Sequence, residues 1–164
     1  MILTLLAILP AISASAQTPP AATDITAADV QAFIKALPPN AVADKPIRVV
    51  DVGGYHVGLF GVLRPKGTKQ EAILHETRTA EVYQILEGSA TLVTGGTIID
   101  GKSDGKAKSA NVRGPRIDGG VSRHVSKGDF IIIPGRLPHW FSSLDSDLTY
   151  LIVRPDIDGE LPLK

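Results

Sequence analysis

The sequence predicts an antiparallel all-β sandwich or barrel preceded by one short helix. From residue 46 onward, short runs rich in β-branched residues alternate with clusters of Gly, Pro, Asp and Ser, a pattern typical of short strands joined by tight turns. Before these runs, apolar residues from Val30 to Leu37 recur at the spacing of one helical face. We therefore expect a single all-β domain with one N-terminal α-helix.

Residues 1–16 are predicted to be a signal peptide. They form an apolar stretch that ends in Ala14, Ser15 and Ala16, a small-x-small pattern typical of signal-peptidase cleavage. The alternative is an N-terminal strand or anchor helix, but the apolar run is shorter than the roughly 20 residues that span a bilayer. Residues 17–25 contain two prolines and small residues, which predicts a flexible leader. The expected location is periplasmic or secreted.

The helix is predicted at about residues 27–37, within a helix and linker segment of residues 26–45. Thr26 is suited to the N-cap position, Asp29 supplies an acidic residue at N3, and Pro38 and Pro39 stop the pattern. We expect the apolar face of this helix to pack on the outside of the β domain, residues 46–164, or on a neighbouring subunit.

Composition excludes several partners and site types. The chain has 17 basic and 17 acidic residues and a formal net charge of zero, so neither nucleic acid nor an anionic membrane is an expected partner. It has no cysteine, which excludes thiolate metal ligands and disulfides. Any metal ion must be held by histidine, carboxylate and water.

The strands are expected in short, regularly spaced segments joined by turns at residues 53–54, 64–67, 87–89 and 144–147. The expected strands are residues 47–52, 55–63, 72–75, 80–86, 90–94, 130–133, 140–142 and 148–153. Between them, residues 95–127 form a long polar insertion. Residues 97–99 and 121–125 are expected to pair as a hairpin, and residues 100–120 to form a mobile surface loop that is either a lid or a solvated insertion without function.

Two stretches carry residues with metal-ligand chemistry. The first runs from His75 through Glu81 to a turn glycine, Gly88, and strand periodicity places His75, Thr77 and Glu81 on one face if the turn near Arg78 preserves parity. Tyr83 shares that face. The second stretch is an apolar strand followed by a proline-bracketed turn and a further imidazole, that of His139.

Together these stretches resemble the paired motifs of the cupin superfamily over residues 46–154. The matching residues are His75, Glu81 and Gly88 in the first motif and Gly128, Pro134 and His139 in the second. Thr77 replaces the second histidine of the family's first motif, and Arg136 replaces a glycine of its second. The resemblance implies a small single-domain cupin, an antiparallel jelly-roll β-barrel.

The resemblance also implies a metal site made of His75, Glu81 and His139. Two histidines and one carboxylate suit a divalent ion such as Fe, Mn, Zn or Ni, and three protein ligands leave positions for substrate and water. Thr77 is either a water-mediated group behind the ligands or a residue chosen for its strand propensity. Tyr83 is either a proton donor to a ligand or an aromatic core residue.

Other residues near the motifs are assigned by parity and context. Phe141 shares the face of His139 and is expected to be a pocket wall, whereas Trp140 is expected to pack elsewhere. Arg136 either faces an anionic substrate or is a solvent-facing turn residue. His56 is expected to be structural and His124 to be exposed, so neither is assigned to the metal site.

Function follows from the fold only in part, because jelly rolls host many activities. The first hypothesis is a small metal-dependent enzyme of oxygenase, isomerase or lyase type that acts on a small molecule. The second is a non-catalytic module that binds a small ligand without metal, and the third is a purely structural secreted protein. A homodimer is the expected assembly, because cupin barrels often pair through edge strands.

Overall fold

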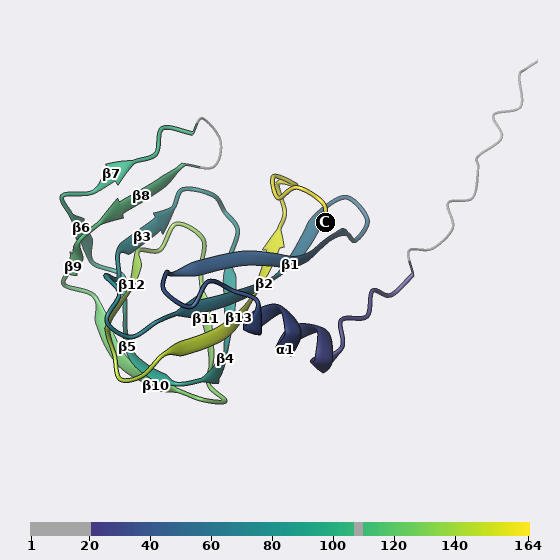
Figure 1. Ribbon diagram of the computed structural model, residues 1–164. Coiled ribbons are helices and arrows are strands. Elements are labelled where there is room, and N and C mark those ends of the chain that lie inside the picture. Colours follow the sequence, from purple (N-terminus) through teal and green to yellow (C-terminus); the bar gives the residue numbers. More distant parts are fainter. Residues whose placement is uncertain (1–20, 107–109) are drawn as a thin grey trace, which may run out of the picture.

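A computed structural model describes residues 21–106 and 110–164 (Figure 1). The predicted signal peptide, residues 1–16, and the first four residues of the predicted leader, 17–20, lie outside the described residues. Residues 21–26 of the chain precede the first helix and form neither helix nor strand. Within the described residues, no helix has the length and apolar character needed to cross a membrane.

The helix α1 (Ala27–Lys35) begins at the predicted cap and ends two residues earlier than expected. Thr26 accepts a hydrogen bond from the Asp29 backbone, and the Asp29 carboxylate accepts one from the Thr26 backbone, which completes a capping box. The helix packs on the outer face of the β domain, where Gly61 lets Phe33 and Ile34 approach the backbone closely. The expected external position of the helix is therefore observed (Figure 1).

The strands form two main antiparallel sheets and one small one. The first sheet contains, in spatial order, β1 (Ala43–Asp51), β2 (His56–Arg64), β13 (Leu148–Asp156), β4 (Glu81–Glu87) and β11 (Phe130–Ile133). The second contains β10 (Val121–Ser126), β5 (Ser89–Thr94), β12 (His139–Leu144), β3 (Ala72–His75), β8 (Asn111–Gly114) and β7 (Lys102–Ser103). The small sheet pairs β6 (Thr97–Ile99) with β9 (Arg116–Asp118).

The strand order is that of a jelly roll. Strands that precede the insertion alternate with strands that come at its end or after it, in the order β2-β13-β4-β11 in one sheet and β3-β12-β5-β10 in the other. The predicted fold class, an antiparallel jelly roll with one N-terminal helix, is thus confirmed. This order has a functional consequence, because β3 pairs with β12 and β4 pairs with β11. The two sequence motifs therefore meet.

A hydrophobic core fills the space between the two sheets. On β4 the inward positions alternate with outward ones, as the two-residue period of a strand requires. The core is rich in aromatic and β-branched side chains; its largest fully buried members are Tyr83, Tyr150, Phe141, Ile85, Leu92, Ile133, Leu148 and Ile152. This packing forms a rigid floor beneath the motif residues.

The insertion differs from its prediction in two ways. The expected hairpin of residues 97–99 with 121–125 is wrong: β6 pairs with β9, whereas β10 pairs with β5. The expected loop of residues 100–120 is also wrong, since it contains β7, β8 and β9. These strands are short and polar, and they form because β3 offers β8 an edge to pair with.

Two of the other strands extend beyond a predicted bound by three residues or more. β1 begins at Ala43, because a register shift after Pro46 lets an edge strand accommodate the proline. β13 continues past residue 153 through Arg154 and Pro155 to Asp156, paired with β2 along this length. The extension carries Arg154 to the neighbourhood of the first motif.

The β4–β5 turn generates a stability prediction. Gly88 has a φ of 87°, and a Cβ there would overlap the backbone oxygen of Asp147. Gly67 has a φ of 89° with nothing within 4 Å of such a Cβ. We expect G67A to lose about 1–2 kcal/mol of unfolding free energy from the left-handed backbone alone, and G88A to lose a further ~1–3 kcal/mol from the overlap. Urea unfolding of both variants measures the difference, and equal losses would contradict the predicted overlap.

Candidate metal centre

Glu81 is the central residue of the site. It is the first residue of β4 and faces inward, like Tyr83 and Ile85 after it, so its side chain is only 3% exposed. An isolated carboxylate at such a position is strongly disfavoured, and it needs partners on both oxygens. Three of these partners come from β3, β12 and β13.

His139 contacts Glu81 from the second motif. It begins β12, directly after Pro138, and is 4% exposed. Its Nδ1 atom lies 3.0 Å from the Leu137 carbonyl oxygen, and its Nε2 atom lies 3.3 Å from Glu81 Oε2. Because a carbonyl only accepts hydrogen bonds, Nδ1 must carry a proton and donate it. In the neutral ring, the Nε2 lone pair therefore points to Glu81.

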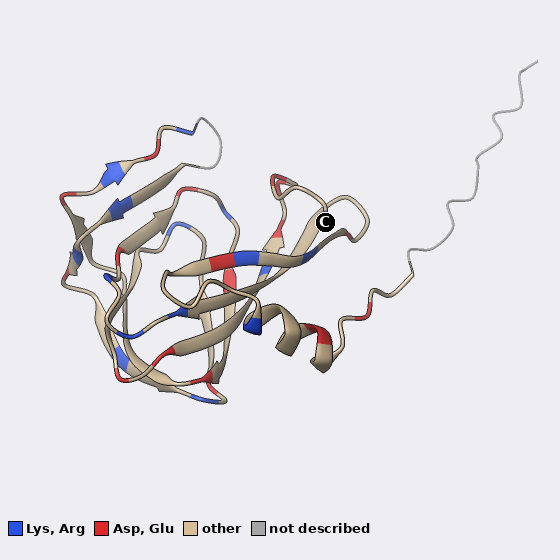
Figure 2. Ribbon diagram, in the orientation of Figure 1, with Lys and Arg blue, Asp and Glu red and all other residues tan. Residues whose placement is uncertain are grey.

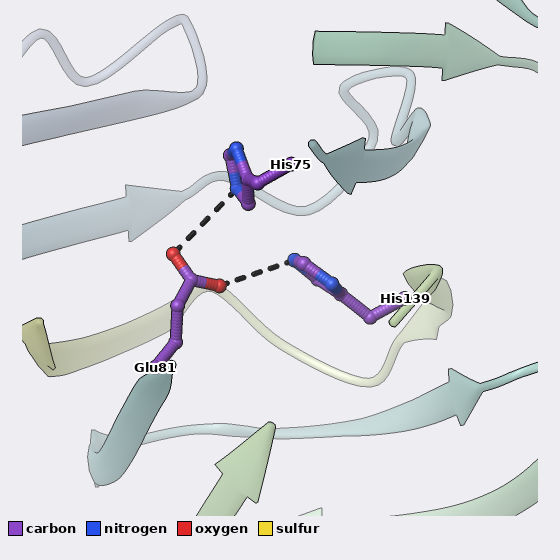
Figure 3. Close-up of side chains that lie close together, drawn as sticks. All are labelled: His75, Glu81 and His139. Atoms are coloured by element: carbon purple, nitrogen blue, oxygen red, sulfur yellow. Dashed lines mark ion pairs between the residues drawn. The ribbon is translucent and has the colours of Figure 1, made fainter. Parts of the chain in front are cut away.

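His75 contacts the same carboxylate from the first motif (Figure 3). It ends β3 and is partly exposed, and its Nε2 atom lies 3.6 Å from Glu81 Oε1. Its Nδ1 atom hydrogen-bonds Asn111 Oδ1. The Asn111 amide nitrogen donates to Asp104 at 2.9 Å, which assigns its oxygen as the acceptor for His75. The Nε2 lone pair of His75 is thus also directed at Glu81.

These three residues fit a metal ion. One ligand atom from each of His75, Glu81 and His139 lies within 4.8 Å of the others. Both imidazoles have the outer nitrogen held by a hydrogen-bond acceptor, the arrangement that orients histidine ligands in metal proteins. Two nitrogen lone pairs and a carboxylate that face one another form an electron-rich centre, which a cation between them stabilises.

The environment sets the protonation of the ligands. Burial lowers the pKa of His75, partly offset by the charge of Glu81, so this ring is neutral at neutral pH. Burial alone would raise the pKa of Glu81, but the adjoining His139 imidazole and the charge of Arg154 hold it well below its usual range. A neutral imidazole beside an ionised carboxylate is the state that binds metal.

Arg154 is a functional residue that the sequence patterns did not reveal. Its Nε atom donates to Glu81 Oε1 at 2.7 Å, and its Nη2 atom lies 2.6 Å from Asp44 Oδ2. The guanidinium also lies 4.2 Å from the ring centre of Phe60. Arg154 has the same parity as the buried Tyr150 and Ile152, but it lies beyond the predicted end of the strand at residue 153 and precedes a proline.

Tyr83 supports the carboxylate. Its hydroxyl donates to Glu81 Oε2 at 2.9 Å, and the side chain is fully buried against Tyr150 and Phe141. Burial, with a contribution from the charge of Glu81, raises the pKa of the phenol well above its ordinary value. We interpret Tyr83 as a positioning residue for Glu81, combining the core and hydrogen-bonding roles considered from the sequence.

The remaining residues considered from the sequence differ in whether they border the site. Thr77 lies in the bend between β3 and β4 and lines a cavity beside His75. Phe141, expected as a pocket wall, instead stacks on Tyr83 in the core and lines neither of the cavities described below. Phe141 is buried, and its neighbours Tyr83 and Arg64 line the larger cavity in its place. Trp140 packs away from the site and donates to the Gln70 carbonyl oxygen.

The other two histidines lie outside the centre, as expected. His56 binds the Leu161 carbonyl oxygen through Nδ1 at 2.8 Å and so ties the C-terminal segment to β2. His124 is largely exposed and pairs with Asp145. Arg136 has a φ of 62°, which explains the glycine usual at this motif position, and its Nε atom donates to the Glu76 carbonyl oxygen.

Two cavities reach the centre, and His75 and Arg154 line both of them. The first has a volume of about 270 Å³ and includes Thr77, Glu81 and the C-terminal residues Glu160 to Pro162 in its wall. The second has a volume of about 470 Å³ and includes Tyr83 and His139. Small molecules can therefore approach the triad from two sides.

Comparisons with known proteins find similarity in fold alone. No family model matches the chain, and no curated protein matches it in sequence. A conserved protein with a double-stranded β-helix domain from Klebsiella pneumoniae is 17% identical at a TM-score of 0.49, over 87% of this chain and 97% of that one. An RmlC-like cupin family protein from Methanocaldococcus jannaschii is 12% identical at 0.41, over 73% and 86%. A structure of oxalate oxidase is 17% identical at 0.48, over 74% and 54%.

The class of the protein is defined by its strand order. Two antiparallel sheets in jelly-roll order, with both motif segments at the same end, form a fold that cupins share with other jelly-roll proteins. The resemblance inferred from the motifs is confirmed at the level of the fold.

The Arg154–Glu81 contact generates a second prediction. R154M removes the guanidinium while keeping much of the apolar stem, and it leaves Glu81 buried without its cation. We expect a loss of about 3–5 kcal/mol in unfolding free energy, the usual cost of breaking a buried ion pair. R78M, which removes the exposed pair of Arg78 with Asp158, should change stability little. Urea unfolding measures both, and equal effects would show that Glu81 does not need Arg154.

Proposed function

We propose that the protein binds one divalent metal ion through His75, Glu81 and His139 and acts as a small metal-dependent enzyme on a small molecule. The supporting observation is that both histidines direct their Nε2 atoms at one buried carboxylate while their Nδ1 atoms are held elsewhere. Oxygenase, isomerase and lyase chemistry all suit such a centre, and the ion is Fe, Mn, Zn or Ni.

The bound ion would supply Lewis acidity toward an oxygen atom of the ligand. The protein's own residues prepare the site for this. The Leu137 carbonyl and the Asn111 side chain orient the two imidazoles, and Tyr83 orients Glu81. The aromatic core excludes water from below, whereas the two cavities admit the ligand from the sides.

A second candidate is a ligand-binding module without metal. It is favoured by Arg154, which already neutralises Glu81, and by Thr77, which occupies the position of a further histidine in the cupin motif. In this case the histidines would line the pocket and bind the ligand directly. Such a module takes up its ligand after chelator treatment, whereas the proposed enzyme does not act without its ion.

Elemental analysis tests the proposed metal site. We expect the wild-type protein to carry one equivalent of a transition metal, and H75A and H139A to retain only a small fraction, because each removes a ligand. H124A is the matched control, since His124 is exposed, pairs with Asp145 and is not part of the triad, and it should retain the full equivalent. Full metal in both H75A and H139A would exclude this ligand set, and a metal-free wild type in the presence of excess ions would favour the binding module.

The role of Tyr83 gives a further prediction. Y83F removes the hydrogen bond to Glu81 Oε2 and should weaken metal affinity about 10–100-fold, as loss of groups that orient ligands usually does. Y150F removes a hydroxyl of equal burial that contacts Arg64 instead. Competition with a fluorescent chelator measures both affinities. Unchanged affinity in Y83F, or an equal loss in Y150F, would contradict the positioning role.

Export and assembly stay predictions from the sequence. Cleavage after Ala16 would be seen as an N-terminus at Gln17 in protein recovered from the periplasm or medium. A homodimer remains the expected assembly. Neither property enters the argument for the metal site.

A further inference from the structure

The larger of the two cavities is rich in positive charge. We call it the cationic cavity. Its charged lining residues are Lys45, Arg64, Lys69, Arg113 and Arg154 on the basic side and Asp44 and Glu71 on the acidic side. They come from both sheets and the segments beside them; Figure 2 shows basic residues on β1 and β8. Basic groups therefore outnumber acidic ones around the entrance to the triad.

Ion pairing leaves part of this charge without a counterion. Arg154 contacts Asp44 and Glu81, and Lys69 lies 3.5 Å from Glu71. Among the described residues, no carboxylate oxygen lies within 4 Å of the charged nitrogens of Lys45, Arg64 or Arg113. A cleft with low-dielectric walls and an excess of one sign of charge attracts ligands of the opposite sign.

Arg64 is the best-positioned of these cations. It is partly buried, its Nε atom donates to the Tyr150 hydroxyl at 2.8 Å, and its Nη1 atom donates to Gln70 Oε1 at 2.8 Å. The guanidinium lies 5.1 Å from the ring centre of Phe141. These contacts hold the group rigidly and use two of the five N–H donors of an arginine. The remaining donors are available for a bidentate contact with a carboxylate or phosphate.

The smaller cavity has no excess of basic residues. Its basic residues, Lys106 and Arg154, are outnumbered by Glu81, Asp156 and Glu160. The two approaches to the triad thus differ in charge, and an anion is favoured on the side of Arg64.

We propose that the cationic cavity binds a small organic anion, with its carboxylate or phosphate group on Arg64. The other end of the ligand then lies beside His75 and His139, which line the same cavity. This second statement rests on the proposed function, because it assigns the reacting end of the ligand to the metal triad. The contact with Arg64 itself requires no metal.

Calorimetry with malonate and inorganic phosphate tests the proposal on the full-length protein, both metal-loaded and chelator-treated. Malonamide has the shape of malonate without its charge and is the neutral control. We expect at least one of the anions to bind, malonamide not to bind, and R64Q to weaken anion binding tenfold or more. R116Q is the matched control, since Arg116 lies on β9 and lines neither cavity; it should bind as the wild type does.

R64K checks the geometry as well as the charge. It keeps a cation but lacks the planar fork, so anion affinity should lie between those of the wild type and R64Q. Unfolding midpoints of all variants show whether the fold is retained. Wild-type affinity in R64Q, binding of malonamide as tight as that of malonate, or no binding of either anion would overturn the proposal.

The experiments distinguish a failure of the proposed metal centre from a failure of the proposed anion site. Metal binding without any dependence of anion affinity on Arg64 supports the metal centre and overturns the anion site. Anion binding that depends on Arg64 in a protein that takes up no metal supports the anion site and overturns the metal-dependent enzyme.

Discussion

The buried carboxylate of Glu81 is the constraint around which the rest of the site is arranged. A carboxylate with almost no solvent contact stays ionised only if its surroundings replace water, and here Arg154 and Tyr83 donate hydrogen bonds to its two oxygens. Arg154 supplies charge, Tyr83 supplies a neutral donor, and the two histidines face the oxygens. Each of these groups is held in turn by partners of its own, so residues of both sheets fix the geometry around Glu81.

The jelly-roll topology explains how a few residues from two short sequence motifs form one site. Strands that are distant in sequence become neighbours: β4 lies between β11 and β13, and β3 lies between β12 and β8. The two motif segments therefore reach the same end of the domain with their inward faces opposed. Below them the packed aromatic rings resist compression, and above them the space stays open to solvent. The polar centre therefore lies between the apolar core and the cavity that is open to solvent.

Local patterns predicted local structure well. The helix cap at Thr26 and the strand Phe130–Ile133 follow from residue type and spacing, and the ligand candidates follow from the motif positions. What could not be predicted depends on pairing in three dimensions. Pro155 suggested the end of a strand, yet β13 continues through it, and this continuation places Arg154 beside Glu81. Asn111 lies in a polar insertion that looked like a loop, and only the pairing of β8 with β3 brings it to His75.

The Asn111–His75 contact lets the insertion influence the orientation of a candidate metal ligand. The hairpin of β7 and β8 is joined to the jelly roll along the edge of β3, and through Asp104 and Asn111 it holds one imidazole in its orientation. A segment of this kind can change in length and sequence without disturbing the core. Natural or engineered substitutions in this hairpin can therefore change how His75 is held. They do so without replacing any inward-facing residue of the site.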